Sequence, residues 1–345
     1  MQQLITQVEK GRVPDVLVRA GIRQLLRQRL REEGGDVEQL NERLYALIDG
    51  MDASPLALST DTANEQHYEL PAGFFEDCLG KHLKYSCCYW RDGVFGLDAA
   101  ERAMLELTCE RAGLADGQDV LELGCGWGSL SLWMAAQYPA SRITAVSNSQ
   151  SQRAFIEARR DAQGLKNLEI ITCDMNDFTT ESRFDRVVSV EMFEHMRNYR
   201  ELMRRISGWL KPGGQLFVHI FCHRELAYVF QTEGDDNWMG KYFFTDGLMP
   251  SDNLLLHFQD QLRLQRRWRV NGRHYQKTCN AWLENMDRRR DTLMPVFRDT
   301  YGADASAWFE RWRVFHMACA ELFGFRGGDE WYISHYLFQR PEESN

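Results

Sequence analysis

The sequence lacks any apolar run that could cross a membrane, since no window of about 18 apolar residues occurs in it. Its amino-terminal stretch, MQQLITQVEKGRVPDVLVRA, also lacks the apolar core of a secretory signal peptide. A net positive charge is absent, because 50 Asp and Glu outnumber 41 Lys and Arg and the net charge is -9. This charge argues against nucleic acid and anionic membrane surfaces as general partners. We expect a cytoplasmic protein with no nucleic-acid partner and no stable membrane association.

Paired cysteine motifs are absent as well. The nine cysteines are an odd number and contain no C-x-x-C spacing. Cys125, Cys173 and Cys222 fall at predicted strand ends, where reduced thiols fit better than disulfides, and this favours a reducing compartment. The H-x-x-C-H run from His219 to His223 invites a zinc interpretation, but ligands so close together would be crowded and no partner pair is evident. The sequence therefore predicts no metal site.

The most informative stretch that is present runs from Asp119 to Gly128 and reads DVLELGCGWG. Apolar residues typical of a buried parallel strand lead into Gly124, Gly126 and Gly128, and a helical segment follows at once. Glycine is needed in such a turn because a Cβ atom would keep a ligand away from the backbone. The stretch therefore predicts a ligand-binding loop between a strand and a helix.

Two common nucleotide signatures do not fit this loop. No G-K-[ST] follows it, which excludes a P-loop. A dinucleotide fingerprint would need a glycine where Ser129 stands, and an acid after the next strand, which ends at Asn148 without one. A Glu-x-Gly-x-Gly-x-Gly run without phosphate-binding groups resembles motif I of the class I methyltransferases that use S-adenosylmethionine. That cofactor carries an adenosine and a charged sulfonium but no phosphate.

Strand-like and helix-like segments alternate through the middle of the chain. This order predicts an α/β fold with a doubly wound, mostly parallel sheet of seven strands. The resemblance to motif I implies the Rossmann-like, class I methyltransferase form of this fold. Ligands of such sheets lie beyond the carboxyl ends of the strands. The predicted strands fall at 119–123, 142–148, 168–175, 184–193, 214–221, 262–275 and 330–340.

The remaining segments predict how the domain is completed. Helical periodicity up to about residue 50 and a polar linker define an N-terminal region, 1–65, which precedes a methyltransferase domain, 66–345. Within that domain we expect the cofactor core at about 100–225. A helical substrate cap should follow at about 226–328, and a final strand at about 329–340. The sequence leaves open whether the N-terminal helices cover the site or support a homodimer.

Polar side chains stand at or just beyond the ends of the second and third predicted strands. Asn148 and Gln152 carry amides suited to ribose hydroxyls, and Asp174 beside Met175 suits an adenine ring and its amino group. Asp174 could instead cap the following segment. We expect these four residues to contact the cofactor.

The fourth predicted strand ends in V-E-M-F-E-H-M, which places Glu191, Glu194 and His195 at the edge of the cofactor site. Two carboxylates and an imidazole are suited to deprotonating and orienting a nucleophile. A lone histidine at a strand end is more often structural, but the two neighbouring acids favour catalysis. We predict that His195 acts as the base, that Glu194 orients it or holds an ammonium group, and that Glu191 adds negative potential.

The loop GKHLKYSCCYWRDG, residues 80–93, is unusually rich in aromatic and thiol side chains. It could be a hydrophobic plug over the core, or it could place aromatic faces near the sulfonium.

Five stretches together identify a family. K-Y-S-C-C-Y, E-L-G-C-G-W-G, S-N-S-x-S-Q, E-M-F-E-H-M and W-L-K-P-G-G resemble the cyclopropane fatty acid synthase-like methyltransferases. H-x-F-C-H, Y-F-F-T-D-G-L-M-P-S-D-N-L-L-L, W-R-V-N-G-R-H-Y and A-E-L-F-G-F are closest to the coclaurine N-methyltransferases within that group. The resemblance runs from Tyr68 onward and, more weakly, over the N-terminal helices.

The resemblance implies roles for individual positions. It implies cofactor contacts by Tyr85, Ser86, the loop Gly124–Gly128, Gln152, Asp174 and Met175, and catalysis by Glu194 and His195. In the lipid-modifying relatives a bicarbonate ion serves as the base. The matching pocket here comprises Cys87, Glu194, His219 and Tyr275, with Phe221 where a small aliphatic residue stands.

We therefore expect an enzyme that uses S-adenosylmethionine to methylate the nitrogen of a small, aromatic or tetrahydroisoquinoline-like amine. The alternative is methyl or methylene transfer to unsaturated acyl chains of lipids. A third interpretation, a cofactor-binding sensor without catalysis, conflicts with the retained Glu191, Glu194 and His195. The acceptor and the number of methyl groups added are not given by the sequence.

Overall fold

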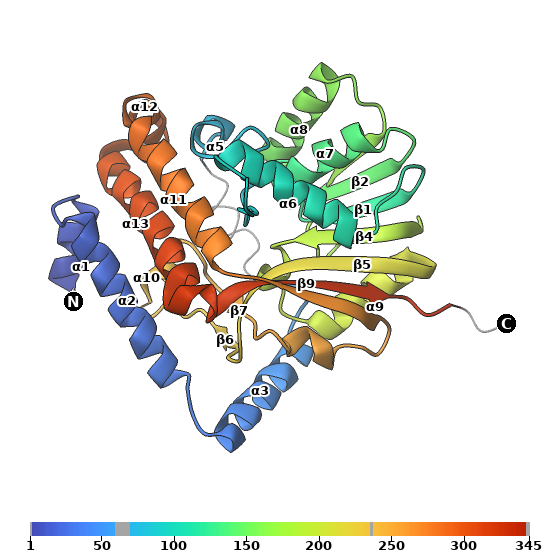
Figure 1. The fold of residues 1–345 in the computed structure, drawn as a ribbon, viewed down its shortest axis with the longest axis horizontal. Helices are drawn as coiled ribbons and strands as arrows, with labels where there is room; N and C mark the ends of the chain where they lie inside the picture. Colours follow the sequence, from blue (N-terminus) through green and yellow to red (C-terminus); the bar gives the residue numbers. More distant parts are fainter. Residues whose placement is uncertain (1, 59–69, 235–236, 343–345) are drawn as a thin grey trace.

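A sheet of seven strands forms the centre of the computed structural model, which describes residues 2–58, 70–234 and 237–342 (Figure 1). The strand order is β3-β2-β1-β4-β5-β9-β8. The first five strands pair in parallel, β9 runs antiparallel to β5, and β8 runs antiparallel to β9. This confirms the predicted mostly parallel, seven-stranded sheet. The strands are β1 (Asp119–Leu123), β2 (Arg142–Ser147), β3 (Leu168–Thr172), β4 (Phe184–Val190), β5 (Leu210–His223), β8 (Arg263–Val270) and β9 (Trp331–Gln339).

Alternating apolar side chains bury both faces of the sheet. Val120 and Val188 belong to a core cluster with α6, α7 and α8, whereas their neighbours Leu121 and Val187 pack in a cluster with α9 and α3. Successive residues of a strand point to opposite faces, so a run of apolar residues is buried on both sides only between two helical layers. These helices are α3 (Val37–Asp52), α6 (Leu97–Arg111), α7 (Ser129–Gln137), α8 (Gln150–Ala162) and α9 (Tyr199–Trp209).

The cap is a set of helices at one end of the sheet (Figure 1). Helices α11, α12 and α13 contact one another, and the N-terminal helices α1 and α2 pack on α13. Arg19 and Arg23 of α2 bind the two carboxylate oxygens of Glu321 on α13, at 3.0 and 2.7 Å. The N-terminal helices thus cover the cap. The two N-terminal helices are α1 (Gln2–Glu9) and α2 (Asp15–Glu32). The three helices of the cap are α11 (Arg273–Arg288), α12 (Arg290–Tyr301) and α13 (Ala305–Gly324).

The segment between β5 and β8 contains short elements that the sequence pattern did not predict. Two two-residue strands, β6 and β7, pair with each other there. Strand β8 also lies inside the range 226–328, so the expected cap is interrupted by one strand of the main sheet. The boundary predicted between residues 65 and 66 lies outside the described residues. The remaining elements are α5 (Ala72–Cys78), η1 (Phe193–His195), β6 (Tyr228–Val229), α10 (Trp238–Tyr242), β7 (Leu248–Met249), η2 (Leu254–His257), η3 (Gly302–Asp304) and η4 (Phe325–Gly328).

Across the described ranges, no helix combines the length and the apolar character that a membrane span requires.

The buried carboxylate of Asp252 ties the segment between β5 and β8 to the edge of the main sheet. It is 2% exposed, and its Oδ2 atom binds the side chains of Arg267 at 3.2 Å and Arg269 at 2.5 Å. Its Oδ1 atom accepts a hydrogen bond from Ser334 at 2.5 Å. These partners come from β8 and β9, so one charge joins three parts of the chain.

We expect Asp252→Asn to destabilise the fold by about 2 kcal/mol, because it removes a buried charge whose partners are only partly exposed to water. Urea unfolding followed by circular dichroism measures this loss. Arg142→Ala is the control, since the Arg142 side chain is 82% exposed in its pair with Asp119 and its loss should leave the urea midpoint unchanged. Equal midpoints for all three proteins would contradict the role given to Asp252.

Candidate active site

The glycine loop lies at the carboxyl end of β1, as predicted. Gly124, Gly126 and Gly128 have φ angles of +77°, +52° and +78°, in the left-handed region that favours glycine. A Cβ atom on Gly124 would approach Met192 to 2.8 Å, and one on Gly128 would approach Ile156 to 2.7 Å. A Cβ atom on Gly126 would meet no atom within 4 Å. Two glycines therefore permit close packing, and the middle one borders open space.

A pocket lies beside this loop, and we call it the glycine-loop pocket. Five residues predicted as site residues line it, namely Tyr85, Ser86, Gly124, Gly126 and Glu191. Three of its polar lining residues were not predicted, namely Lys84, Glu122 and Ser129. The loop 80–93 therefore forms one wall of the site. The remaining lining residues are Leu83, Leu105, Thr108, Cys125, Trp127, Leu130 and Val190.

Two buried polar atoms near the loop fit the hydrogen-bonding groups of an adenosine-type ligand. Ser129 Oγ and Gln152 Nε2 have no hydrogen-bond partner among the described residues. Gln152 is 2% exposed, and its Oε1 atom accepts from the Ser147 hydroxyl at 2.6 Å, which orients the amide. Buried polar groups are costly without a partner, so these atoms indicate where a ligand completes the site.

Three other residues predicted to contact the cofactor, Asn148, Asp174 and Met175, do not line this pocket. Asn148 is exposed after β2. Asp174 follows β3, and its Oδ1 atom accepts from the backbone N–H of Asn176 at 2.7 Å. Met175 is 7% exposed and belongs to the core cluster under α9. The structure therefore brings these residues to the same edge of the sheet as the glycine loop.

Lys84 brings a buried positive charge into the site. It is 3% exposed, and its Nζ atom donates to Ser86 Oγ at 2.5 Å. Burial raises the pKa of Glu122 to about 8, partly offset by a hydrogen bond from Ser131 and by the Lys84 charge. Sequence reasoning missed both Lys84 and Glu122, although each stands inside a motif that was quoted for the family.

The carboxylate of Glu191 gathers three of the predicted pocket residues. Its Oε1 atom accepts from the backbone N–H of Cys87 at 3.0 Å and lies 3.1 Å from Nε2 of His219. Its Oε2 atom accepts from the Tyr275 hydroxyl at 2.6 Å. Burial raises the pKa of Glu191, whereas Lys84 and the hydrogen bonds from Cys87 and Tyr275 lower it. The groups expected around a bicarbonate ion thus surround a carboxylate of the chain itself.

The backbone of Glu191 is in the left-handed region, with φ of +49°. Such a conformation is uncommon for a residue with a Cβ atom and costs about 1 kcal/mol or more. Its N–H bonds to the carbonyl oxygen of His219 at 2.8 Å. This turn ends β4 and leads directly into η1, which carries Glu194 and His195.

Glu194 and His195 lie on η1 and have contrasting surroundings. Glu194 is fully buried, its Oε1 atom accepts from the Phe221 N–H at 2.8 Å, and its Oε2 atom has no hydrogen-bond partner among the described residues. Burial and the neighbouring Glu191 charge hold the pKa of Glu194 well above its usual range. Burial lowers the pKa of His195 to about 4, and its ring lies edge-on to Phe244. At neutral pH the imidazole is therefore uncharged.

Aromatic rings surround this cluster. Tyr275 stacks on Phe323, with ring centroids 4.4 Å apart, and Phe221 lies between Phe323 and Phe244. Phe244 and Phe323 come from the segment 226–258 and from α13, so the cap supplies part of the wall. This is an apolar surround for a charged centre, which strengthens electrostatic interactions inside it.

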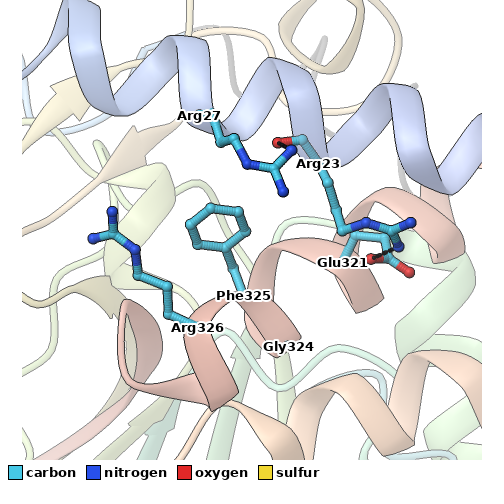
Figure 2. Close-up of a pocket in the computed structure, with 6 residues that line it drawn as sticks. All are labelled: Arg23, Arg27, Glu321, Gly324, Phe325 and Arg326. Carbon is cyan, nitrogen blue, oxygen red and sulfur yellow. Dashed lines mark hydrogen bonds and ion pairs between the residues drawn. The ribbon is translucent and has the colours of Figure 1, made fainter.

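A second pocket, of about 340 Å³, lies between α2 and the end of α13 and contains none of the predicted site residues. Figure 2 shows Arg23, Arg27 and Arg326 around the ring of Phe325. Arg23 is paired with Glu321 at 2.7 Å and Arg326 with Glu330 at 2.8 Å, so two of these charges are already neutralised. We therefore assign the chemistry to the glycine-loop pocket.

Comparison with known proteins agrees with this arrangement. The family model for mycolic acid cyclopropane synthetase matches residues 58–330. The chain belongs to this family. It is 37% identical to (S)-coclaurine N-methyltransferase of Thalictrum flavum subsp. glaucum, over 98% of this chain and 95% of that one. It is 30% identical to cyclopropane-fatty-acyl-phospholipid synthase of Escherichia coli strain K12, over 81% of this chain and 68% of that one.

A crystal structure of coclaurine N-methyltransferase bound to N-methylheliamine and SAH superposes with a TM-score of 0.95. The two are 36% identical, and the match covers 98% of this chain and 99% of that one. This member of the mycolic acid cyclopropane synthetase family is therefore a methyltransferase whose methyl donor is S-adenosylmethionine. The resemblance identified from the sequence motifs is confirmed.

Gly126→Ala should weaken binding of S-adenosylmethionine by at least about tenfold, because the new methyl group fills space that the ligand needs. Isothermal titration calorimetry measures the dissociation constant. Gly117→Ala is the matched control, since Gly117 also has a positive φ, +86°, and open space around its Cβ position, but lies before β1. If both variants bind the cofactor like the parent protein, Gly126 does not border the cofactor site.

Proposed function

We propose that the chain transfers a methyl group from S-adenosylmethionine to the nitrogen of a small aromatic amine. One observation carries the proposal: a buried Glu194 carboxylate presents an unpaired oxygen next to Glu191, inside a wall of aromatic rings. An ammonium group fits such a site because it brings the missing positive charge, and aromatic faces add cation–π attraction. The tetrahydroisoquinoline-like amines expected from the sequence have this combination of ring and nitrogen.

The cofactor would be held by the glycine loop and by groups from three further segments. Gly126 leaves room against the backbone, Ser129 and Gln152 supply buried polar atoms, and Tyr85 and Ser86 line the opposite wall. Asn148, Asp174 and Met175 stand at the same edge of the sheet and complete the proposed set. S-adenosylmethionine supplies an electrophilic methyl group, so the chain needs only to position the amine and remove its proton.

The electrostatics favour Glu194 as the group that takes the proton from the ammonium. A carboxylate whose pKa is raised by burial and by the Glu191 charge is a stronger base than an ordinary one. His195 is uncharged with a pKa of about 4, which suits an orienting contact better than the role of first base. We therefore propose the reverse of the roles expected from the sequence, with both residues still in the site.

The surroundings of Glu191 weigh against a bicarbonate base. The Cys87 N–H, His219 and the Tyr275 hydroxyl all reach its carboxylate, and the Phe221 N–H reaches Glu194. A bound anion would have to displace or protonate Glu191, because two negative charges at one buried position repel each other. Amine methylation needs no such ion, so this arrangement supports it over transfer to acyl chains.

Mass spectrometry of reactions with labelled S-adenosylmethionine tests the proposed function. One acceptor panel holds tetrahydroisoquinolines and arylalkyl amines, and the other holds vesicles of unsaturated phospholipids. We expect label on amine nitrogen and none on acyl chains. Label on acyl chains alone would overturn the proposal in favour of lipid modification, and cofactor binding without turnover of either panel would favour a binding protein.

Glu194→Gln should lower kcat by about 10² to 10⁴-fold while cofactor affinity stays within a few-fold, because it removes the proposed base but little volume. In the parent enzyme kcat/KM should rise with pH through the raised pKa of Glu194, since only the ionised carboxylate accepts a proton. In the variant, kcat/KM should instead rise with pH through the pKa of the amine itself.

The control for this variant is Glu330→Gln. Glu330 is another buried carboxylate beside a histidine, 3.2 Å from His223 Nε2, but its second oxygen is paired with Arg326 at 2.8 Å, whereas Oε2 of Glu194 has no partner among the described residues. Glu330→Gln should keep the parental pH profile of kcat/KM. An unchanged pH profile in Glu194→Gln would show that Glu194 is not the base.

A further inference from the structure

A line of hydrogen-bonding groups leads from Glu191 away from the proposed amine site. Nε2 of His219 lies 3.1 Å from the Glu191 carboxylate, and Nδ1 of His219 lies 3.0 Å from Nε2 of His335. Nδ1 of His335 lies 2.8 Å from the Arg111 guanidinium group. The line ends there, on the last residue of α6, which is partly exposed. No motif in the sequence marks Arg111 or His335.

The backbone holds the two histidines together. His219 on β5 and His335 on β9 are direct partners in the antiparallel register, and both are fully buried. Trp268 on β8 is the next partner of His335 across the sheet, and Arg111 lies over its ring. The order of three neighbouring strands and one helix therefore fixes the geometry of the line.

The direction of each hydrogen bond follows from the chemistry of the end groups. Burial holds the pKa values of His219 and His335 well below the usual range, so both rings are neutral and each has one donor and one acceptor. A guanidinium group can only donate, so Nδ1 of His335 accepts and its Nε2 carries the proton. That proton points to Nδ1 of His219, and Nε2 of His219 therefore donates to Glu191.

We propose that Arg111 and His335 are positioning residues of the active site. Through two neutral imidazole rings, the guanidinium group selects the tautomer of His219 that donates a hydrogen bond to the Glu191 carboxylate. The ionised state of Glu191 then depends on a residue outside the glycine-loop pocket. Its benefit to catalysis rests on the proposed function, in which the Glu191 charge strengthens Glu194 as a base.

Other charged and titratable groups face this line and also affect the pKa values of its members. Lys84, Cys87, Tyr275, Glu194 and His195 act on Glu191. Lys84 also acts on both histidines, and Tyr89, Glu110 and Arg266 act on Arg111. Arg111 differs from these groups because it donates a hydrogen bond to the ring of His335. Its removal therefore changes the direction of the hydrogen bonds along the line as well as the charge.

Arg111→Met should lower kcat/KM at neutral pH by about tenfold, the lower end for outer groups that orient a functional histidine. Without the Arg111 donor, His335 and His219 can exchange tautomers, so that Nε2 of His219 becomes an acceptor facing Glu191. The Glu191 carboxylate then binds a proton. The pKa of Glu191 rises, so activity should recover as pH increases. Arg111→Lys keeps a donor and should restore most of the activity at neutral pH.

Arg266→Met is the matched control. Arg266 lies over the same Trp268 ring at the same distance as Arg111, 5.2 Å, and has no described hydrogen bond to the histidines. Arg266→Met removes one positive charge and one cation–π contact, as Arg111→Met does, although Arg266 is the more exposed of the two. It should keep the parental pH profile, and equal losses in the two variants would overturn the proposal.

A spectroscopic measurement tests the line without any substrate. Nitrogen NMR of protein with isotope-labelled histidine distinguishes a protonated Nε2 from a protonated Nδ1, and signals missing from His335→Gln and His219→Gln assign the two rings. We expect Nε2 protonated in both rings of the parent protein and of Arg266→Met, and a shift toward Nδ1 protonation in Arg111→Met. Protonated Nδ1 in the parent protein, or identical spectra for the parent and Arg111→Met, would overturn the proposal even if no amine is methylated.

Discussion

The carboxylate of Glu191 is the constraint on which the site depends. It joins the end of β4 to the loop 80–93 through Cys87, to β5 through His219 and to α11 through Tyr275. A buried charge is tolerated only with enough donors around it, and here the donors come from parts of the chain far apart in sequence. The cofactor core and the cap are therefore both packed against this one carboxylate.

The strained backbone of Glu191 has a consequence for its neighbours. The turn after β4 places Glu194 against the backbone of β5, where one of its oxygens is bonded and the other is not. Packing alone would have satisfied or removed that oxygen. Its persistence in an apolar, aromatic surround is typical of a site that a charged ligand completes.

The family includes relatives named for N-methylation and for the synthesis of cyclopropane-fatty-acyl phospholipids. Cys87, His219 and Tyr275 occupy positions that the resemblance connects with a bicarbonate ion, yet here they enclose a side-chain carboxylate. If a relative binds an ion at this place, as the resemblance implies, a built-in carboxylate would alter the local electrostatics without altering the sheet. On the proposed function, this difference lets a chain that resembles lipid-modifying enzymes over most of its length accept an amine.

The sequence by itself determined the class of fold and of chemistry. Alternating periodicity and the glycine loop predicted a parallel sheet with its site at the strand ends, and the family motifs identified the methyl donor. These features are local, since a glycine spacing or a strand followed by a helix is visible in a short window. The short strands β6 and β7 were not predictable in this way, because two residues carry no periodicity.

Only the tertiary structure decided how the candidate site residues are arranged. Cys87 and Tyr275 lie 104 and 84 positions from Glu191, and no periodicity reports that their donors meet on one carboxylate. The contrast between Glu194 and His195, adjacent in sequence, depends on burial and on the charge of Glu191, which only packing creates. The same holds for Arg111, whose link to the site exists because β5 and β9 pair in one register and α6 ends above them.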